Sequence, residues 1–272
     1  MLTPELKAAL SGETTPKFLA TLDAEGRPNC VPVISLTPWD DTTLVFGEFF
    51  MNKTRRNLLI NAKVGVAVIN DKLDGWSLKG TFLGFETTGP RIEWLNQTPL
   101  FRYNAYTSAR SAGAIRIEQV SALPTISRSR LLCDFARVRL LAPLAKAHGR
   151  TCMPGRVSEK FQRTRAVRAL AFRGEDGYPR ALPILACIPA GSGRLLMRPP
   201  MRAPRLDGRR VPLAPDTEVA VAVITMEPIA YQVKGTYRGE MGGCGLIELK
   251  ECYSASPPLL GERLDTPPQS SA

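Results

Sequence analysis

Residues 64–82 read VGVAVINDKLDGWSLKGTF, and residues 219–237 read VAVAVITMEPIAYQVKGTY. Eight of these nineteen aligned positions are identical at a constant shift of 155 residues, whereas ordinary amino-acid usage gives about one chance match. The two stretches therefore predict that one structural unit occurs twice in the chain. A period this long indicates a duplicated domain rather than a solenoid, and two copies in one chain can form an internal dimer.

The similarity continues on both sides of these stretches, where the residue shift between the two copies differs from 155. Upstream, the turn at 26–28 (GRP) faces 177–179 (GYP), and downstream GAIRIE at 113–118 faces GLIELK at 245–250. The unequal shifts place an insertion in the first copy. We expect a first copy over 1–125 with its insertion at 86–112, a connecting segment at 126–164, a second, degenerate copy at 165–256 and a disordered tail at 257–272.

The pattern within each copy predicts a mainly β fold with short helices. In the first copy, short apolar runs separated by Gly, Pro and Asp turns indicate strands at 17–22, 30–36, 42–46, 64–70, 76–85 and 114–122. Helices are expected at 4–9 and 53–62, the second with Asn52 as its N-cap. Residues 130–144 are expected to form a strand pair or one long strand. Six strands in hairpin order with one crossover helix favour a small closed barrel.

Composition narrows the classes of function. No apolar run reaches the ~20 residues of a membrane span, and residues 1–15 lack a secretory signal pattern; we expect a cytoplasmic protein with no membrane partner. Six cysteines without CxxC spacing and one histidine, His148, make a zinc site improbable. The net charge of +11 fits an anionic partner, but aromatic residues suited to base stacking do not accompany the basic clusters, so nucleic acid is not expected.

One segment has the chemistry of an anion site. The segment 49–58 (FFMNKTRRNL) lies between a predicted strand and a helix start. Free N–H groups and the helix dipole favour an anion there, Lys53 adds a point charge, Thr54 a hydroxyl, and Arg55 or Arg56 a guanidinium fork. Cations are unfavourable at the positive end of a helix, which argues for a bound phosphate. The alternative is an ordinary exposed basic helix.

Together, ATLDAEGRPNCVPV (20–33), NKTRRNLLINAKVGVAVIN (52–70) and LKGTF (78–82) resemble the FMN-binding split barrel of the pyridoxamine 5′-phosphate oxidase-like superfamily. The resemblance implies two tandem six-stranded Greek-key split barrels that form an internal pseudo-dimer, with FMN in the groove between barrels. It covers the first copy well, from about residue 18 to 85, and the second copy more loosely.

The resemblance also assigns candidate FMN-binding residues. The phosphate would be held by Lys53, Thr54 and Asn57, with Arg56 nearby. The isoalloxazine ring would be lined or flanked by Val31, Pro32, Val33, Ser35, Phe46 and Gly47, and Trp76 and Lys79 would face the same region. Pro32 and Pro183 are equally consistent with edge-strand prolines. No catalytic residue and no metal ligand is identified.

The second copy departs from this pattern at the phosphate site. At the shift of 155, Lys53, Thr54 and Asn57 correspond to Gly208, Arg209 and Pro212. We expect that the second copy has lost its own cradle and serves as the partner of the first, although Arg202, Arg205, Arg209 and Arg210 leave a second anion site open.

Three classes of function remain. The first is an FMN-dependent oxidoreductase acting on a small molecule, in which the flavin carries the chemistry. The second is a non-catalytic protein that binds a flavin, F420 or heme, with His148 as the only histidine available to heme. The third is a structural or nucleic-acid role. A homodimer is a further possibility, Tyr103 and Tyr106 in the insertion are candidates to cap a flavin, and Cys244 lies either in an exposed loop or in a glycine turn.

Overall fold

The computed structural model describes residues 1–48, 51–98, 109–146, 152–198, 205–206, 209–210, 213–227, 229–256 and 259–265. The first half contains α1 (Pro4–Ser11), β1 (Lys17–Leu22), β2 (Pro28–Pro32), β3 (Thr37–Pro38), β4 (Thr43–Gly47), α2 (Asn52–Ile60), β5 (Lys63–Ile69), β6 (Gly75–Glu86), α3 (Pro90–Gln97) and β7 (Ala112–Ala122). The second half contains α5 (Arg128–Leu141), α6 (Gly155–Gln162), β8 (Val167–Arg173), β9 (Pro179–Pro183), β10 (Cys187–Pro189), β11 (Arg194–Met197), β12 (Arg205–Leu206), β13 (Arg209–Arg210), β14 (Glu218–Ile224), β15 (Ala230–Met241) and β16 (Cys244–Ser254).

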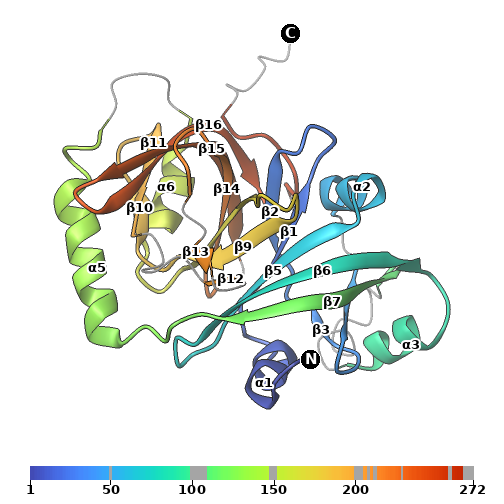
Figure 1. The fold of residues 1–272 in the computed structure, drawn as a ribbon. Helices are drawn as coiled ribbons and strands as arrows, with labels where there is room; N and C mark the ends of the chain where they lie inside the picture. The colour runs from blue at the N-terminus through green and yellow to red at the C-terminus, as the bar shows by residue number, and fades with distance from the viewer. Residues whose placement is uncertain are drawn as a thin grey trace, which may run out of the picture.

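Two antiparallel sheets of seven strands confirm the predicted tandem barrels (Figure 1). The first has the order β2-β1-β5-β6-β7-β4-β3 and the second β10-β11-β16-β15-β14-β8-β9. Each strand of the second sheet corresponds to one of the first, so the two orders are the same order read in opposite directions. Each sheet has a short seventh strand, β3 in the first and β10 in the second. In the first copy, a turn was expected at the position of β3.

The repeated VxVAVI motif has a structural reason, because its strand is buried on both faces. Val64, Val66 and Val68 of β5 point into the core of the first barrel. On the opposite face, Gly65 and Ala67 meet the second barrel, where a Cβ on Gly65 would lie 2.3 Å from the carbonyl oxygen of Pro179. The small residues therefore permit the close approach of the two sheets.

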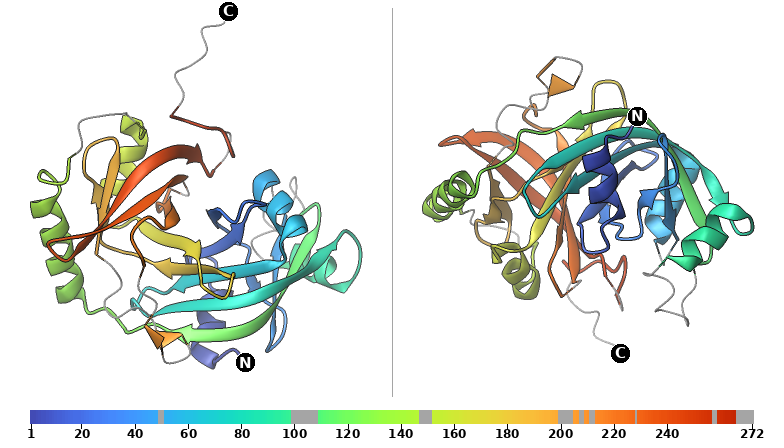
Figure 2. Two further views of the ribbon diagram at one scale, coloured as in Figure 1. Left: turned by 45° about the horizontal axis from the view of Figure 1, so that its top comes forward. Right: turned by 90° about the horizontal axis from the view of Figure 1, so that it is seen from below.

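The second barrel repeats this arrangement, which makes the interface reciprocal. Its valines in β14 fill its own core, whereas Ala220 and Ala222 join Ala20 and Ala67 in one cluster between the halves. Strand β9 packs on β5 and β6, and β2 packs on β14 and β15 (Figure 2). The same surface of each barrel meets its counterpart, as in an isologous dimer. The predicted internal pseudo-dimer is confirmed.

A buried cation ends the first helix of each copy. Lys17 of β1 donates its ammonium to the carbonyl oxygens of Leu10 and Gly12, at 2.9 and 3.0 Å. Its counterpart 151 residues later, Arg168 of β8, donates to four carbonyl oxygens at the end of α6 and nearby, including that of Leu185 at 2.9 Å. Helix C-terminal carbonyls lack intrahelical donors, so these cations satisfy them. The duplicated unit therefore includes the preceding helix.

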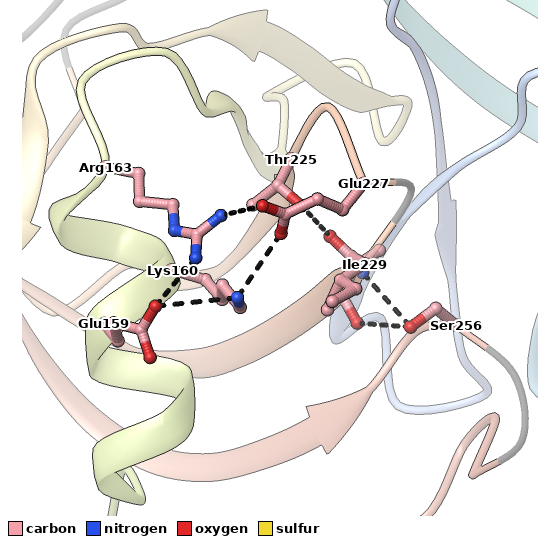
Figure 3. Close-up of polar contacts among 8 residues, drawn as sticks. Glu159, Lys160, Arg163, Thr225, Glu227, Ile229 and Ser256 are labelled. Atoms are coloured by element: carbon pink, nitrogen blue, oxygen red, sulfur yellow. Dashed lines mark hydrogen bonds and ion pairs between the residues drawn. The ribbon is translucent and has the colours of Figure 1, made fainter.

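Surface ion pairs also fasten α6 to the second barrel. Glu227, in the turn between β14 and β15, accepts from Lys160 of α6 and from Arg163, the residue that follows the helix, and Arg163 also bonds Glu159 at 2.9 Å (Figure 3). Glu159, Arg163 and Glu227 are open to solvent and Lys160 is partly buried, so their pairs position the helix without forming a buried site.

The connecting segment differs from its prediction. The expected strand over 130–144 is wrong, because α5 occupies Arg128–Leu141. Ser127 caps this helix by accepting a hydrogen bond from the Arg130 amide at 3.3 Å, and its Leu, Arg and Ala residues are strong helix formers. Phe135 and Val138 pack on the outer face of the second sheet. In the first barrel α3, part of the insertion, covers the corresponding face.

Two further expectations differ from the structure. Asn52 is the first residue of α2 rather than its cap, and the N-cap position, Met51, provides no side-chain hydrogen bond. The tail was expected to be disordered, but its described part folds back on β16: Arg263 forms a bridge with Tyr253, and the Cys252 amide donates to Asp265 at 3.3 Å. The remaining domain boundaries stay predictions.

Candidate functional site

The N-terminus of α2 lies at the junction of the two barrels. The helix has no acidic residue in its first turn and no side-chain cap, so its first N–H groups and the positive end of its dipole are left without an internal anion. Lys53, in this turn, lies against the ring of Tyr253 of β16, with its Nζ 5.1 Å from the ring centroid. The helix start of the first copy therefore meets the last strand of the second.

Thr54 and Asn57 hold this helix on the barrel. Both are 2 % exposed. The Thr54 hydroxyl accepts from the side-chain amide of Asn29 at 3.2 Å, and the Asn57 amide donates to the hydroxyl of Thr21 at 3.0 Å. The Thr54 hydroxyl hydrogen remains available to donate toward the helix start, whereas one donor of Asn57 is already used. These two residues position Lys53 against the second barrel.

The second copy contributes Lys234, which the sequence analysis missed. Lys234 of β15 is 8 % exposed and lies close enough to Lys53 for the charge of Lys53 to act on its amine. Burial, and then the charge and hydrogen bond of Lys53, lower the pKa of Lys234 from 10.5 to about 7. The two amines thus face one another across the junction.

The nearby carboxylates do not neutralise this pair. Asp23 and Glu251 favour the charged form of Lys234, but each has another partner. Asp23 accepts from the backbone and guanidinium of Arg27 at 2.8 and 3.0 Å, and Glu251 accepts from the Tyr253 hydroxyl at 3.1 Å. Within the described part of the chain, neither Lys53 nor Lys234 forms a salt bridge within 4.0 Å. Among the described residues, the two amines are therefore left without a carboxylate in direct contact.

The pseudo-symmetric position shows the opposite arrangement. Lys79, the counterpart of Lys234, forms an ion pair with Asp176 at 2.9 Å and lies 4.0 Å from the ring centroid of Tyr178. Both partners belong to the β8–β9 turn of the second copy. The predicted flavin residue Lys79 is thus closed off by a carboxylate and an aromatic ring. Of two equivalent lysines, only Lys234 is left without a salt bridge in the described residues.

The remaining predicted residues divide into two groups. Val31 and Pro32 are half-buried on β2 at the edge of the first sheet, and the Ser35 hydroxyl accepts from the Gly47 amide at 3.2 Å, which joins β4 to the end of this segment. Val33, Phe46 and Trp76, by contrast, lie in the core of the first barrel. Those three side chains support the barrel and do not line its surface.

Other predicted features fall away from the junction or outside the described residues. Arg56 is exposed on α2, while Arg55 forms an ion pair with Glu48. Cys244 is fully buried after a glycine turn, so an exposed loop thiol there is wrong. Tyr103, Tyr106 and His148 lie outside the described residues, as do the side chains of Arg202, Arg205, Arg209 and Arg210.

Two further observations bear on what could bind. Among the described residues, no group of His, Cys, Asp and Glu is arranged to hold a metal ion. A cavity of about 100 Å³ lies beside the connecting segment, lined by residues such as Leu73, Leu123 and Arg198. Its volume is well below that of ordinary cofactor sites, about 300–1,000 Å³, so it does not fit a flavin.

Comparison with known proteins gives the class first. The model of the pyridoxamine 5′-phosphate oxidase family matches residues 2–122. The first half of the chain therefore has the pyridoxamine 5′-phosphate oxidase-like split barrel, and the second half repeats its topology. A search of curated proteins found no match.

Individual solved structures are similar to about one half of the chain. HupZ from Group A Streptococcus is 28 % identical, with a TM-score of 0.40, over 45 % of this chain and 94 % of its own. An FMN-binding protein from Syntrophomonas wolfei is 17 % identical, with a TM-score of 0.38, over 44 % and 85 %. HutZ, a heme storage protein from Vibrio cholerae, is 18 % identical, with a TM-score of 0.33, over 44 % and 92 %.

Proposed function

We propose that this protein binds one FMN per chain at the junction of its two barrels, with the phosphate between Lys53 and Lys234. The observation that carries the proposal is the approach of these two lysines, one from each copy, at an uncapped helix N-terminus. A phosphate dianion supplies a negative group in direct contact with both amines, which the nearby carboxylates do not provide. Its presence also offsets the cost of an ammonium on the buried Lys234.

The residues around the pair fit the rest of this assignment. The Thr54 hydroxyl and the first N–H groups of α2 are donors for phosphate oxygens. Strand β2 is an edge strand of its sheet. The amide and carbonyl of Val33, which follows it, are used by Lys17 and Leu36, so we assign the polar edge of a flat ring to the backbone of the neighbouring Pro32, Ile34 and Ser35. When bound, FMN supplies the redox chemistry, and the chain binds and orients it. We propose an oxidoreductase of the pyridoxamine 5′-phosphate oxidase-like type that acts on a small molecule.

The same geometry supports one site rather than two. At the pseudo-symmetric position, Asp176 and Tyr178 take the place that an anion has beside Lys234. The described residues of the second copy between β11 and β14 form the short strands β12 and β13 rather than a helix equivalent to α2. The second copy acts as the partner that completes the site of the first.

Titration of the purified protein with FMN, followed by visible absorption and flavin fluorescence, tests the binding. We expect saturation at one equivalent per chain and weaker binding of riboflavin, which lacks the phosphate. Lys53→Met and Lys234→Met are expected to lower FMN affinity at least about tenfold, the effect of one lost charge-assisted contact. Lys79→Met is the matched control and keeps wild-type affinity.

Four results would contradict parts of the proposal. Binding of two equivalents would return an anion site to the second copy. Equal affinity for FMN and riboflavin would show that Lys53 and Lys234 do not bind the phosphate. If bound FMN is neither reduced by NAD(P)H nor reoxidised with turnover of a small molecule, the protein binds a flavin without catalysis. Binding of F420 or heme in preference to FMN would overturn the assignment of FMN as the cofactor.

A further inference from the structure

Helix α5 has an apolar outer surface that nothing in the described structure covers. Its inner side packs on the second barrel through Phe135 and Val138. On its outer side Leu132 is 70 % exposed and Leu140 77 %, and Leu144 in the following turn is 76 % exposed. The helix runs along the outer edge of the second barrel, away from the junction with the first (Figures 1 and 2). Leucines exposed to this degree in one row are unusual for a free surface.

The helical positions of these residues form an ordered stripe. At about 100° per residue, Leu132, Ala136 and Leu140 fall within an arc of about 80°. Arginines lie on both sides of this arc: Arg128 and Arg139 on one side, and Arg130 and Arg137 on the other. We call this set, with Leu144, the α5 stripe. An apolar band between two rows of arginines is the pattern of a helix that lies in a membrane interface.

Charge selects the partner of the α5 stripe. The helix has four arginines and one acidic residue, Asp134, and the whole chain has a net charge of +11. A second copy of this chain would bring equal positive charge against the stripe. An anionic surface instead attracts it. Arg137 donates to the Gly242 carbonyl at 2.9 Å and Arg130 lies 3.9 Å from Asp134, so Arg128 and Arg139 are the side chains that reach the lipid headgroups while the leucines enter the acyl boundary.

The shape of the stripe favours lipid over an acidic protein. Protein interfaces concentrate their energy in aromatic and arginine anchors that enter pockets, but the outer side of α5 has no aromatic residue. The helix is also convex and offers a row of leucines rather than a groove. We propose that the α5 stripe binds the surface of membranes rich in anionic phospholipids.

This binding is interfacial and does not require a spanning segment. None of the described helices is long and apolar enough to cross a membrane, and α5 has only 14 residues. The sequence argument against a membrane partner considered only spanning segments. Because residues 130–144 were expected to form a strand, their helical positions were not considered.

Flotation with lipid vesicles tests the proposal. We expect the protein to float with vesicles of phosphatidylcholine that contain about 30 % phosphatidylglycerol, to stay behind with phosphatidylcholine alone, and to be released by high salt. The double variant Leu132→Ser/Leu140→Ser is expected to lower the partition at least about tenfold. Met226→Ser, which removes an equally exposed apolar side chain in the β14–β15 turn, leaves it unchanged.

A native cysteine gives an independent readout. Cys133 lies beside the stripe and is exposed, whereas the other five cysteines are buried. A polarity-sensitive fluorophore on Cys133 should shift to shorter wavelength with anionic vesicles and not with neutral ones. Wild-type protein that fails to float at low salt, or a leucine variant that floats equally well while keeping its melting temperature, would overturn the proposal. A homodimer that only the leucine variant dissociates would assign the stripe to a second copy, and capture by an acidic protein without vesicle binding would assign it to a protein partner.

Discussion

Replacement of Lys234 by Met should stabilise the ligand-free protein and weaken FMN binding at least about tenfold. Lys234 is buried at the barrel junction, where burial and Lys53 oppose its ammonium form and lower its pKa from 10.5 to about 7. Methionine has a similar length and no charge, so it can occupy the same space without this cost. A residue that the ligand needs is thus expected to destabilise the empty protein.

The size of the effect follows from the pKa difference. A displacement of about 3.5 pKa units corresponds to about 5 kcal/mol when the group is charged in both states. Rearrangement of the lysine stem toward solvent reduces this figure, and even about 2 kcal/mol raises the melting temperature by roughly 4–8 °C for a protein of this size. We therefore expect an increase of several degrees for Lys234→Met at pH 6.

The pH dependence has a definite sign. The folded protein holds the pKa of Lys234 below the unfolded value of 10.5, so folding releases a proton between about pH 7 and 10.5. The cost of the lysine grows as the pH falls through this window and is constant below it. The advantage of Lys234→Met should accordingly be largest near pH 6 and vanish by about pH 10.5. An anion raises the pKa of Lys234, so phosphate affinity of the wild type should decline above pH 7.

Thermal unfolding of the wild type and of Lys234→Met at several pH values, with and without FMN, measures these effects. Lys79→Met is the control with the opposite expected sign, because Lys79 has a salt bridge to Asp176 and its loss should destabilise the protein by up to about 1 kcal/mol. A lower melting temperature for Lys234→Met at pH 6, or a difference independent of pH, would refute the reasoning. If FMN stabilises the wild type and Lys234→Met equally, Lys234 does not bind the phosphate.

Two further substitutions test the fold. Arg168→Met leaves four carbonyl oxygens near the end of α6 without their donor and should lower the free energy of unfolding, measured by denaturant titration, by about 3–5 kcal/mol. The exposed control Arg165→Met should change this free energy by less than about 0.5 kcal/mol. Equal effects of the two substitutions would show that the buried contacts of Arg168 contribute nothing. Gly65→Ala places a methyl group against the Pro179 carbonyl of the other barrel and should lower the melting temperature, at a cost of about 1–3 kcal/mol. Gly155→Ala, where no atom lies within 4 Å of the added Cβ, serves as its control. An unchanged melting temperature for Gly65→Ala would show that the close approach of the two barrels does not contribute to stability.

The sequence by itself determined the architecture. The repeated VxVAVI and KGT segments identified two copies of one barrel, because a buried strand between its own core and a partner accepts only a narrow choice of residues at alternate positions. The helix start at Lys53 could also be found, since turn and capping chemistry is local. The same repeat held an unused signal: Lys234 occupies the position of Lys79, and a pseudo-twofold interface brings one of these lysines to each of two equivalent places.

Only the tertiary structure decided what those places contain. Lys79 meets Asp176, whereas Lys234 meets Lys53, and no local pattern distinguishes the two lysines because their partners are more than 90 residues away in the chain. Burial is decided in the same way: only packing shows that the side chains of Phe46 and Trp76, which the resemblance assigns to the surroundings of a ring, lie in the core of the first barrel. Residues 130–144 were misassigned for a related reason: a helix with apolar residues on both its inner and outer sides has no clear period, and only its contact with the second sheet shows which side is buried.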